Sequence, residues 1–96
     1  MKAITFQGIE TLAFEEVRDP TLQDGGDVVV RVTVAGICGS DLHPYFGRET
    51  GLDVGTVMGH EVVGEIVDVG AAVDRWAVGD RVVAPFTTSG GDCPYC

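Results

Sequence analysis

Runs of apolar residues separated by glycine-rich turns predict a chain of short β-strands. The strongest run is 28–35 (VVVRVTVA), which is partly continuous and partly alternating, so we expect this strand to be buried on much of both faces. Turn residues lie on both sides of it and of the other apolar runs. Further strands are predicted at 2–6, 12–17, 61–69 and 81–86.

One short helix is predicted from about residue 41 to residue 46. Ser40 is a suitable N-cap, and Pro44 is tolerated in a first turn. Many short strands, 14 glycines and almost no helix indicate a mainly β fold, either a barrel or a sandwich. No Gly-x-Gly-x-x-Gly stands between a strand and a helix, so these residues lack the dinucleotide fingerprint.

Composition limits the classes of partner. A chain of 96 residues with 45% hydrophobic and 22% charged residues is ordinary for one small folded domain. Fifteen acidic against six basic residues give a net charge of −9, which disfavours nucleic acid and anionic membrane surfaces as partners. No apolar run approaches the roughly 18 residues of a membrane span. The first residues enter a strand-like pattern directly, and we expect a cytoplasmic protein.

The residues that carry chemistry gather in two stretches, 36–43 and 59–64. Cys38 offers a thiolate and His60 an imidazole nitrogen, which both suit zinc. Taken singly, Cys38 is compatible with a small core residue and the pair His60 and Glu61 with an ordinary surface pair. Glycines on both sides of each ligand favour turns with close backbone approach, so the two stretches together predict a catalytic zinc site with an open position.

Three motifs resemble the medium-chain zinc-dependent alcohol dehydrogenases, and the resemblance extends over the whole chain. They are Cys38-Gly-Ser-Asp-x-His43, Gly59-His60-Glu61-x-x-Gly64-x5-Gly70-x-x-Val73 and Gly79-Asp80-Arg81-Val82. The resemblance implies that residues 1–96 form a partial amino-terminal catalytic domain. Its fold would be a GroES-like, partly open β-barrel with one short helix, incomplete here. A Rossmann domain that binds NAD or NADP would follow and is absent from this chain.

The resemblance also implies roles for individual residues. Cys38 and His60 would be two of three ligands to the catalytic zinc, and the third, a downstream cysteine or aspartate, is not in this chain. Glu61 would lie beside the metal as an alternative ligand. Asp41 would accept a hydrogen bond from the ligand histidine and so fix its tautomer. A carboxylate that only begins a helix remains the alternative for Asp41.

Proton transfer and substrate contact are implied for three further residues. Ser40 and His43 would pass the alcohol proton towards solvent, which suits a histidine pKa of about 6.5. Phe86 would lie in the substrate pocket. The alternatives are a helix cap for Ser40, a solvated surface residue for His43 and a core residue for Phe86.

A second, incomplete metal motif lies at residues 89–96. Many relatives carry a structural zinc on four cysteines that begin Cys-x-x-Cys-x-x-Cys, and here Gly90 stands at the first of them. Cys93 and Cys96 would be the second and third ligands, which leaves the shell short. An odd total of three cysteines fits metal ligation in a reducing compartment better than a disulfide framework. A redox pair and two plain reduced thiols remain the alternatives.

The resemblance implies an oxidoreductase that transfers hydride between a small-molecule alcohol, polyol or aldehyde and NAD(P). Zinc and NAD or NADP would be its cofactors, and the full-length protein would form a homo-oligomer, either a dimer or a tetramer. The 96 residues alone are expected to be inactive and to expose strand edges. The alternative is a non-enzymatic GroES-like binding or assembly module with relict zinc residues. A zinc-free quinone reductase is disfavoured because those relatives generally lack the cysteine and the Gly-His-Glu sequence.

Overall fold

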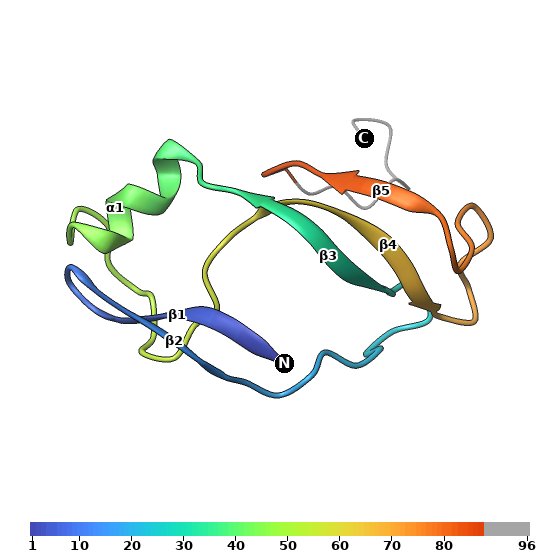
Figure 1. Cartoon of the computed structure of the whole chain (residues 1–96), viewed down its shortest axis with the longest axis horizontal. Coiled ribbons are helices and arrows are strands. Elements are labelled where there is room, and N and C mark those ends of the chain that lie inside the picture. The colour runs from blue at the N-terminus through green and yellow to red at the C-terminus, as the bar shows by residue number, and fades with distance from the viewer. Residues whose placement is uncertain (88–96) are drawn as a thin grey trace.

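The computed structural model describes residues 1–87, and these are mainly β (Figure 1). The strands fall into two antiparallel sheets, a hairpin and a three-stranded sheet. A 3-10 turn and a single-turn helix join the third strand to the fourth. The elements are β1 (Lys2–Gly8), β2 (Thr11–Glu16), β3 (Val28–Gly36), η1 (Gly39–Asp41), α1 (Leu42–Tyr45), β4 (Glu61–Val69) and β5 (Arg81–Ala84).

The predicted strands are all present, with small differences at their ends. β4 has the predicted bounds, and the first hairpin differs from the prediction by at most two residues at either end of each strand. β5 ends at Ala84 instead of residue 86. The next residue is Pro85, which has no N–H to donate to a neighbouring strand.

β4 is the central strand of the sheet β3-β4-β5. The antiparallel register pairs Gly36 with Glu61, so the end of β3 lies beside the start of β4. Close approach in the middle of the sheet requires a glycine, because a Cβ atom at the buried Gly64 would overlap the Arg31 carbonyl oxygen. This contact adjoins a register shift in β3, between Val32 and Val34.

The segment 53–58 brings the chain from α1 to the start of β4. It lies along β1, where the Phe6 N–H donates to the Thr56 carbonyl (2.8 Å) and the Met58 N–H donates to the Ile4 carbonyl (2.9 Å). The tip of the hairpin in turn contacts α1, because the Glu10 N–H donates to the Tyr45 carbonyl (2.7 Å). The hairpin of β1 and β2 is therefore hydrogen-bonded both to α1 and to the segment 53–58, which leads from α1 to the start of β4.

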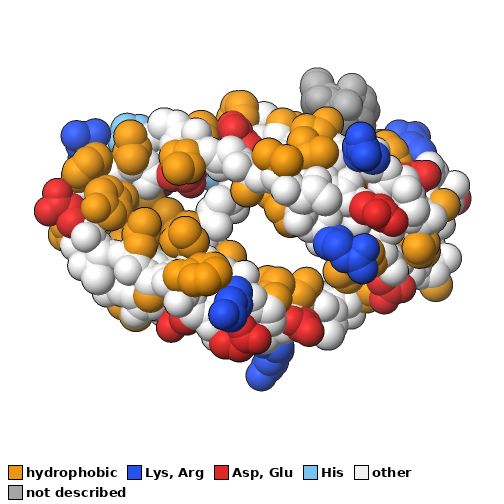
Figure 2. All heavy atoms as spheres, viewed as in Figure 1, with side chains coloured by type: hydrophobic (Ala, Val, Ile, Leu, Met, Phe, Trp, Pro, Cys, Tyr) orange, Lys and Arg blue, Asp and Glu red, His pale blue; other side chains and the backbone are white. Residues whose placement is uncertain are grey.

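The two sheets enclose an opening instead of a closed barrel (Figure 2). Among the described residues, the fully or nearly fully buried side chains are few: Phe6 is 8% exposed, Ile66 is 1% exposed and Thr5 is fully buried. The predicted partly open, mainly β fold is confirmed. None of the described helices is long and apolar enough to cross a membrane.

The expectation that strand 28–35 is buried on both faces was wrong. Only Val29 and Val30 of β3 are half-buried, and the other residues of the strand are exposed. β4 pairs with one edge of β3, and no element within residues 1–87 pairs with the other edge. Exposed strand edges were expected for these 96 residues, and within residues 1–87 one edge of β3 is unpaired, with exposed apolar side chains such as Val32 and Val34 on that strand.

The predicted helix at 41–46 is shorter and begins differently. A 3-10 turn at Gly39–Asp41 precedes the four-residue α1. The residue in the cap position of this turn is Cys38, so the prediction of Ser40 as cap was wrong. The Asp41 carboxylate accepts a hydrogen bond from the Cys38 N–H (2.9 Å), which satisfies a donor that the turn leaves free.

Candidate metal centre

Three potential metal ligands converge where β3 ends and β4 begins. One ligand atom each from Cys38, His60 and Glu61 lie within 4.8 Å of one another, and all three residues are half-buried. Cys38 follows β3, His60 precedes β4, and Glu61 is the first residue of β4. The pairing of Gly36 with Glu61 brings together residues that are more than twenty positions apart.

Two glycines make room for these side chains. Gly59 has a φ of +104°, a conformation that costs a residue with a Cβ atom, and the chain turns there just before His60. Gly36 leaves space for the Glu61 carboxylate, because a Cβ atom at Gly36 would lie 3.3 Å from Glu61 Oε2. Larger residues at these two positions would displace the start of β4 or the Glu61 side chain.

Two polar neighbours, Ser40 and Asp41, contact the His60 ring from opposite sides. Nδ1 lies 3.2 Å from Asp41 Oδ1, and because a carboxylate only accepts, this neighbour favours a proton on Nδ1. Nε2 lies 3.1 Å from Ser40 Oγ. Ser40 Oγ is also 3.4 Å from Cys38 Sγ, to which it can donate. Ser40 therefore lies between the two ligand atoms.

The thiol and the imidazole alter each other's protonation. Hydrogen bonds from Ser40 lower the pKa of Cys38, and the neighbouring His60 lowers it further, against the effects of desolvation and of the Glu61 charge. The hydrogen bond to Cys38 raises the pKa of His60, with a further contribution from the negative charge of Asp41. The lowered pKa favours the Cys38 thiolate, which is the form of cysteine that binds metals, whereas the raised pKa favours protonated His60, which must lose a proton before it binds a metal.

The donor set fits zinc. Zinc is bound in proteins by thiolate sulfur, imidazole nitrogen and carboxylate oxygen, and catalytic sites use three protein ligands. Cys38, His60 and Glu61 supply one of each kind. Since Nδ1 of His60 faces Asp41, Nε2 is the nitrogen left for a metal. The described residues thus offer three ligands, including the carboxylate that the sequence indicated only as an alternative.

Some predicted site residues lie elsewhere or outside the described residues. His43 is exposed on α1, and within residues 1–87 no hydrogen bond to its side chain is present. Phe86 is 67% exposed and follows β5, so it is not a core residue in this structure. Cys93 and Cys96, with Gly90, lie outside the described residues.

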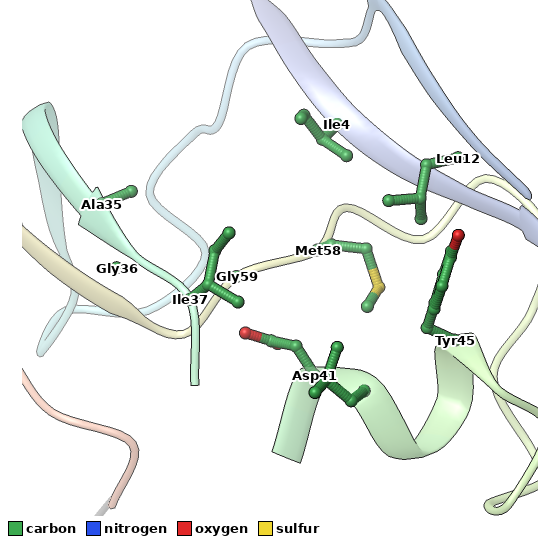
Figure 3. A pocket seen from close by; sticks show the side chains of 10 residues that line it. Ile4, Leu12, Ala35, Gly36, Ile37, Asp41, Tyr45, Met58 and Gly59 are labelled. Atoms are coloured by element: carbon green, nitrogen blue, oxygen red, sulfur yellow. The ribbon is translucent and has the colours of Figure 1, made fainter. Parts of the chain in front are cut away.

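An apolar hollow of about 400 Å³ adjoins the ligand cluster (Figure 3). It lies between the hairpin, the end of β3, α1 and the segment that precedes His60. The apolar residues that line the hollow were not predicted from the sequence, although several of them are immediate neighbours of the ligand motifs. The apolar side chains that line the hollow include Ile4, Leu12, Ile37, Leu42, Tyr45 and Met58.

Comparison with known proteins identifies the family. The alcohol dehydrogenase GroES-like domain matches residues 24–96. The chain therefore belongs to the family of alcohol dehydrogenase GroES-like domains. This agrees with the mainly β, partly open fold and with the ligand cluster between β3 and β4.

Two similar proteins and two similar solved structures support this assignment. The chain is 50% identical over its whole length to a zinc-type alcohol dehydrogenase B from Aspergillus flavus, and 49% identical to a medium chain reductase/dehydrogenase from Acremonium sp. It covers 22% and 33% of these two proteins. The chain thus spans between about a fifth and a third of the length of these curated relatives.

The structural similarity is equally extensive. An alcohol dehydrogenase from Thermus sp. ATN1 superposes with a TM-score of 0.91 at 48% identity, over 100% of this chain and 28% of that one. A zinc-binding dehydrogenase from Sinorhizobium meliloti, bound to NADP, superposes with a TM-score of 0.76 at 31% identity, over 99% of this chain and 27% of that one.

Proposed function

We propose that this chain provides the zinc-binding, substrate-facing part of an oxidoreductase that transfers hydride between an alcohol, a polyol or an aldehyde and NAD(P). The observation that carries the proposal is the convergence of Cys38, His60 and Glu61 within 4.8 Å. Similarity to proteins named zinc-type alcohol dehydrogenases supports it. A small-molecule alcohol or carbonyl compound would be the substrate.

The metal-binding residues would act together. Cys38, His60 and Glu61 would hold zinc, and Asp41 would keep the His60 Nδ1 proton in place so that Nε2 stays free to bind. When bound, zinc acts as a Lewis acid that lowers the pKa of an alcohol hydroxyl towards neutrality. Glu61 is the first residue of β4 and is half-buried, so its carboxylate would bind or release the metal with little movement of the strand.

Ser40 and His43 would handle the proton of the alcohol. The Ser40 hydroxyl lies among the ligand atoms, 3.1 Å from His60 Nε2, and can accept one proton while it donates another. His43 lies on the exposed side of α1, which suits exchange of protons with solvent. Phe86 would contact the substrate from the end of β5, where its side chain is largely exposed.

A dinucleotide would complete the site from outside these residues. The related dehydrogenase from Sinorhizobium meliloti is bound to NADP, and it is several times longer than this chain. We infer that a Rossmann domain supplies NAD or NADP to the metal centre from another part of the protein. A cytoplasmic location, where the thiolate would stay reduced, and assembly into a dimer or a tetramer are part of the same proposal.

Zinc content and activity of the protein, at the length that its gene encodes, test the proposal. We expect about one catalytic zinc per chain. Cys38→Ser should remove it and with it the alcohol-dependent reduction of NAD(P). Glu61→Gln should weaken zinc binding, because an amide carries no negative charge.

Glu65→Gln is the matched control for Glu61→Gln. Glu65 lies four residues further along β4 and is exposed, so its substitution should leave zinc content and activity unchanged. Activity that persists without metal in Cys38→Ser would reject the proposal. Negligible zinc in the unmodified protein would favour the non-enzymatic module, which the convergent ligands and the named relatives do not favour.

A further inference from the structure

The tip of the first hairpin, residues 8–11, lies against the end of α1 (Figure 1). One backbone hydrogen bond joins the two, and the side chain of Ile9 lies against Gly47, two residues after the helix. We propose that Ile9 is a positioning residue. Its contact with Gly47 holds α1 and the 3-10 turn before it, and so keeps Ser40 between the two ligand atoms.

Gly47 is suited to this contact in two ways. Its φ is +75°, in the left-handed region that favours glycine. A Cβ atom at Gly47 would lie 2.7 Å from Ile9 Cδ1 and 3.1 Å from Ile9 Cγ1, which is closer than two carbon atoms pack. The side chain of Ile9 therefore fills the space that a larger residue would need at position 47.

The hairpin tip has an unfavourable backbone conformation that contacts must support. Glu10 has a φ of 56° and is the one non-glycine residue with a positive φ within residues 1–87. A residue with a Cβ atom keeps such a conformation only where its surroundings hold it. The Glu10 N–H donates to the Tyr45 carbonyl at 2.7 Å, and Thr11 Oγ1 donates to the Ile9 carbonyl at 3.1 Å. The contact with α1 thus supports the shape of the tip.

The helix in turn needs support from outside. A helix of four residues is far shorter than the roughly 12 residues at which an isolated helix becomes even marginally stable, and α1 contains no buried residue. The carbonyls of His43 and Pro44 accept from residues that directly follow the helix. The Tyr45 carbonyl accepts from Glu10 instead. The hairpin therefore supplies a hydrogen bond that α1 does not obtain locally.

Movement of α1 would be transmitted to Ser40, because the 3-10 turn ends at Asp41 and the helix begins at the next residue. Ser40 Oγ lies 3.1 Å from His60 Nε2 and 3.4 Å from Cys38 Sγ, so a displacement of about 1 Å would break at least one of these contacts. The ligands Cys38 and His60 adjoin the paired strands β3 and β4. Loss of the contact at the hairpin tip should therefore displace Ser40 more than the two ligands.

Ile9→Ala tests the proposal in the protein at the length that its gene encodes. Ile9 is 65% exposed, so the variant removes little packing other than the contact with Gly47. We expect backbone hydrogen exchange in residues 39–47, followed by mass spectrometry, to become at least about 3-fold faster. We also expect kcat for alcohol oxidation to fall about 10-fold, with zinc content and KM unchanged.

Ile9→Val is the conservative variant. It keeps both Cγ atoms and loses only Cδ1, so it should recover most of the lost kcat and most of the protection from exchange. Unchanged exchange in Ile9→Ala would overturn the proposal. Faster exchange with unchanged kcat in an active enzyme would also overturn it, because the contact would then have no effect through Ser40.

Gly47→Ala and Gly51→Ala form a matched pair. Both glycines have a positive φ, +75° and +100°, so an alanine is strained at either position. A Cβ atom at Gly47 would meet Ile9, whereas a Cβ atom at Gly51 would have no atom within 4 Å. Gly47→Ala should therefore reproduce both effects of Ile9→Ala, and Gly51→Ala should produce neither.

The double variant with Ile9→Ala and Gly47→Ala should be no worse than Gly47→Ala alone, because the two changes remove the same contact. Equal effects of Gly47→Ala and Gly51→Ala would mean that backbone strain, and not the contact with Ile9, controls the turn. That result would count against the proposal.

The kinetic part of this inference rests on the proposed function, and the hydrogen exchange part does not. If the unmodified protein oxidises no alcohol, the proposed function fails, and exchange in residues 39–47 still decides whether Ile9 holds the turn. If the unmodified protein is active and Ile9→Ala changes neither exchange nor kcat, this inference fails and the proposed function stands.

Discussion

The two ends of β4 both depend on glycine, but glycine does different things there. At the start, Gly59 turns the chain and Gly36 of the neighbouring strand leaves space for a carboxylate, so that functional side chains can meet. At the other end, the buried Gly70 removes a side chain so that backbones can touch. A Cβ atom at Gly70 would overlap the Gly25 carbonyl oxygen, and the Gly70 N–H donates to the Asp27 carbonyl at 2.7 Å.

The two ends of β4 have different roles: polar side chains gather at its start, and backbone packing holds its other end. The first end holds half-buried polar groups, which contact one another through Ser40 and Asp41. The second end is held by backbone hydrogen bonds, such as that from the Ala72 N–H to the Gly25 carbonyl (2.8 Å). We therefore expect substitutions at the first end to change metal binding and substitutions at the second end to change stability.

The largest effect is expected at the ligand end. His60→Ala should reduce the zinc content from about one ion per chain to almost none, because the imidazole is one of three ligands. The free energy of unfolding of the metal-free protein should fall by about 1 kcal/mol, because the half-buried His60 side chain loses its contacts with Ser40 and Asp41. Metal analysis and urea unfolding measure the two quantities. Full zinc content in His60→Ala would contradict the assignment of metal binding to the start of β4.

Removal of zinc should have the next largest effect. At a free zinc concentration of 100 times the dissociation constant, binding to the folded state stabilises it by about 2.7 kcal/mol, and a chelator should abolish this gain. The same gain is expected in a variant altered only at the Gly70 end, because distant sites contribute additively. Urea unfolding with and without chelator provides the test, and an equal unfolding midpoint in both conditions would contradict it.

Gly70→Ala should destabilise the protein by about 2 kcal/mol, because the added methyl group meets the backbone of Gly25. Zinc content of the folded protein should not change. Gly26→Ala is the control from the same contact region, since its Cβ atom would meet only Asp24 Oδ1 at 3.9 Å and its φ is not positive. Equal unfolding midpoints for the two variants would show that Gly70 is not required for packing.

The smallest effect is a shift in the pH dependence of Cys38 in metal-free protein. Because Ser40 lowers the pKa of Cys38, the thiol should be alkylated at half its maximal rate at a lower pH in folded than in unfolded protein. Ser40→Ala should move this midpoint upwards. Mass spectrometry of the peptide that contains Cys38 follows the rate, and an unmoved midpoint would contradict the role of Ser40.

The altered pKa values of Cys38 and His60 make the stability of the metal-free protein depend on pH in opposite ways. The lowered pKa of Cys38 contributes stability that is present above the pKa of the unfolded thiol and is lost as the pH falls through the folded value. The raised pKa of His60 contributes stability that is present below the unfolded pKa and is lost as the pH rises through the folded value.

Much of this arrangement could be predicted from the sequence. Periodic apolar residues and turn residues located the strands, including β4 with its observed bounds, because these signals are local. The residue types of Cys38 and His60 indicated zinc because the chemistry of a side chain does not depend on the fold. The family resemblance assigned Glu61 and Asp41 to the same centre.

Other features required the tertiary structure, because they depend on contacts between distant segments. The register that pairs Gly36 with Glu61 decides that the ligands meet, and no local pattern specifies a register between strands 25 residues apart. The position of Ser40 between Cys38 and His60, instead of at a helix cap, follows from the 3-10 turn. The exposure of β3 was missed for the same reason: an apolar run shows that a strand can be buried, whereas only its neighbours in space decide whether it is.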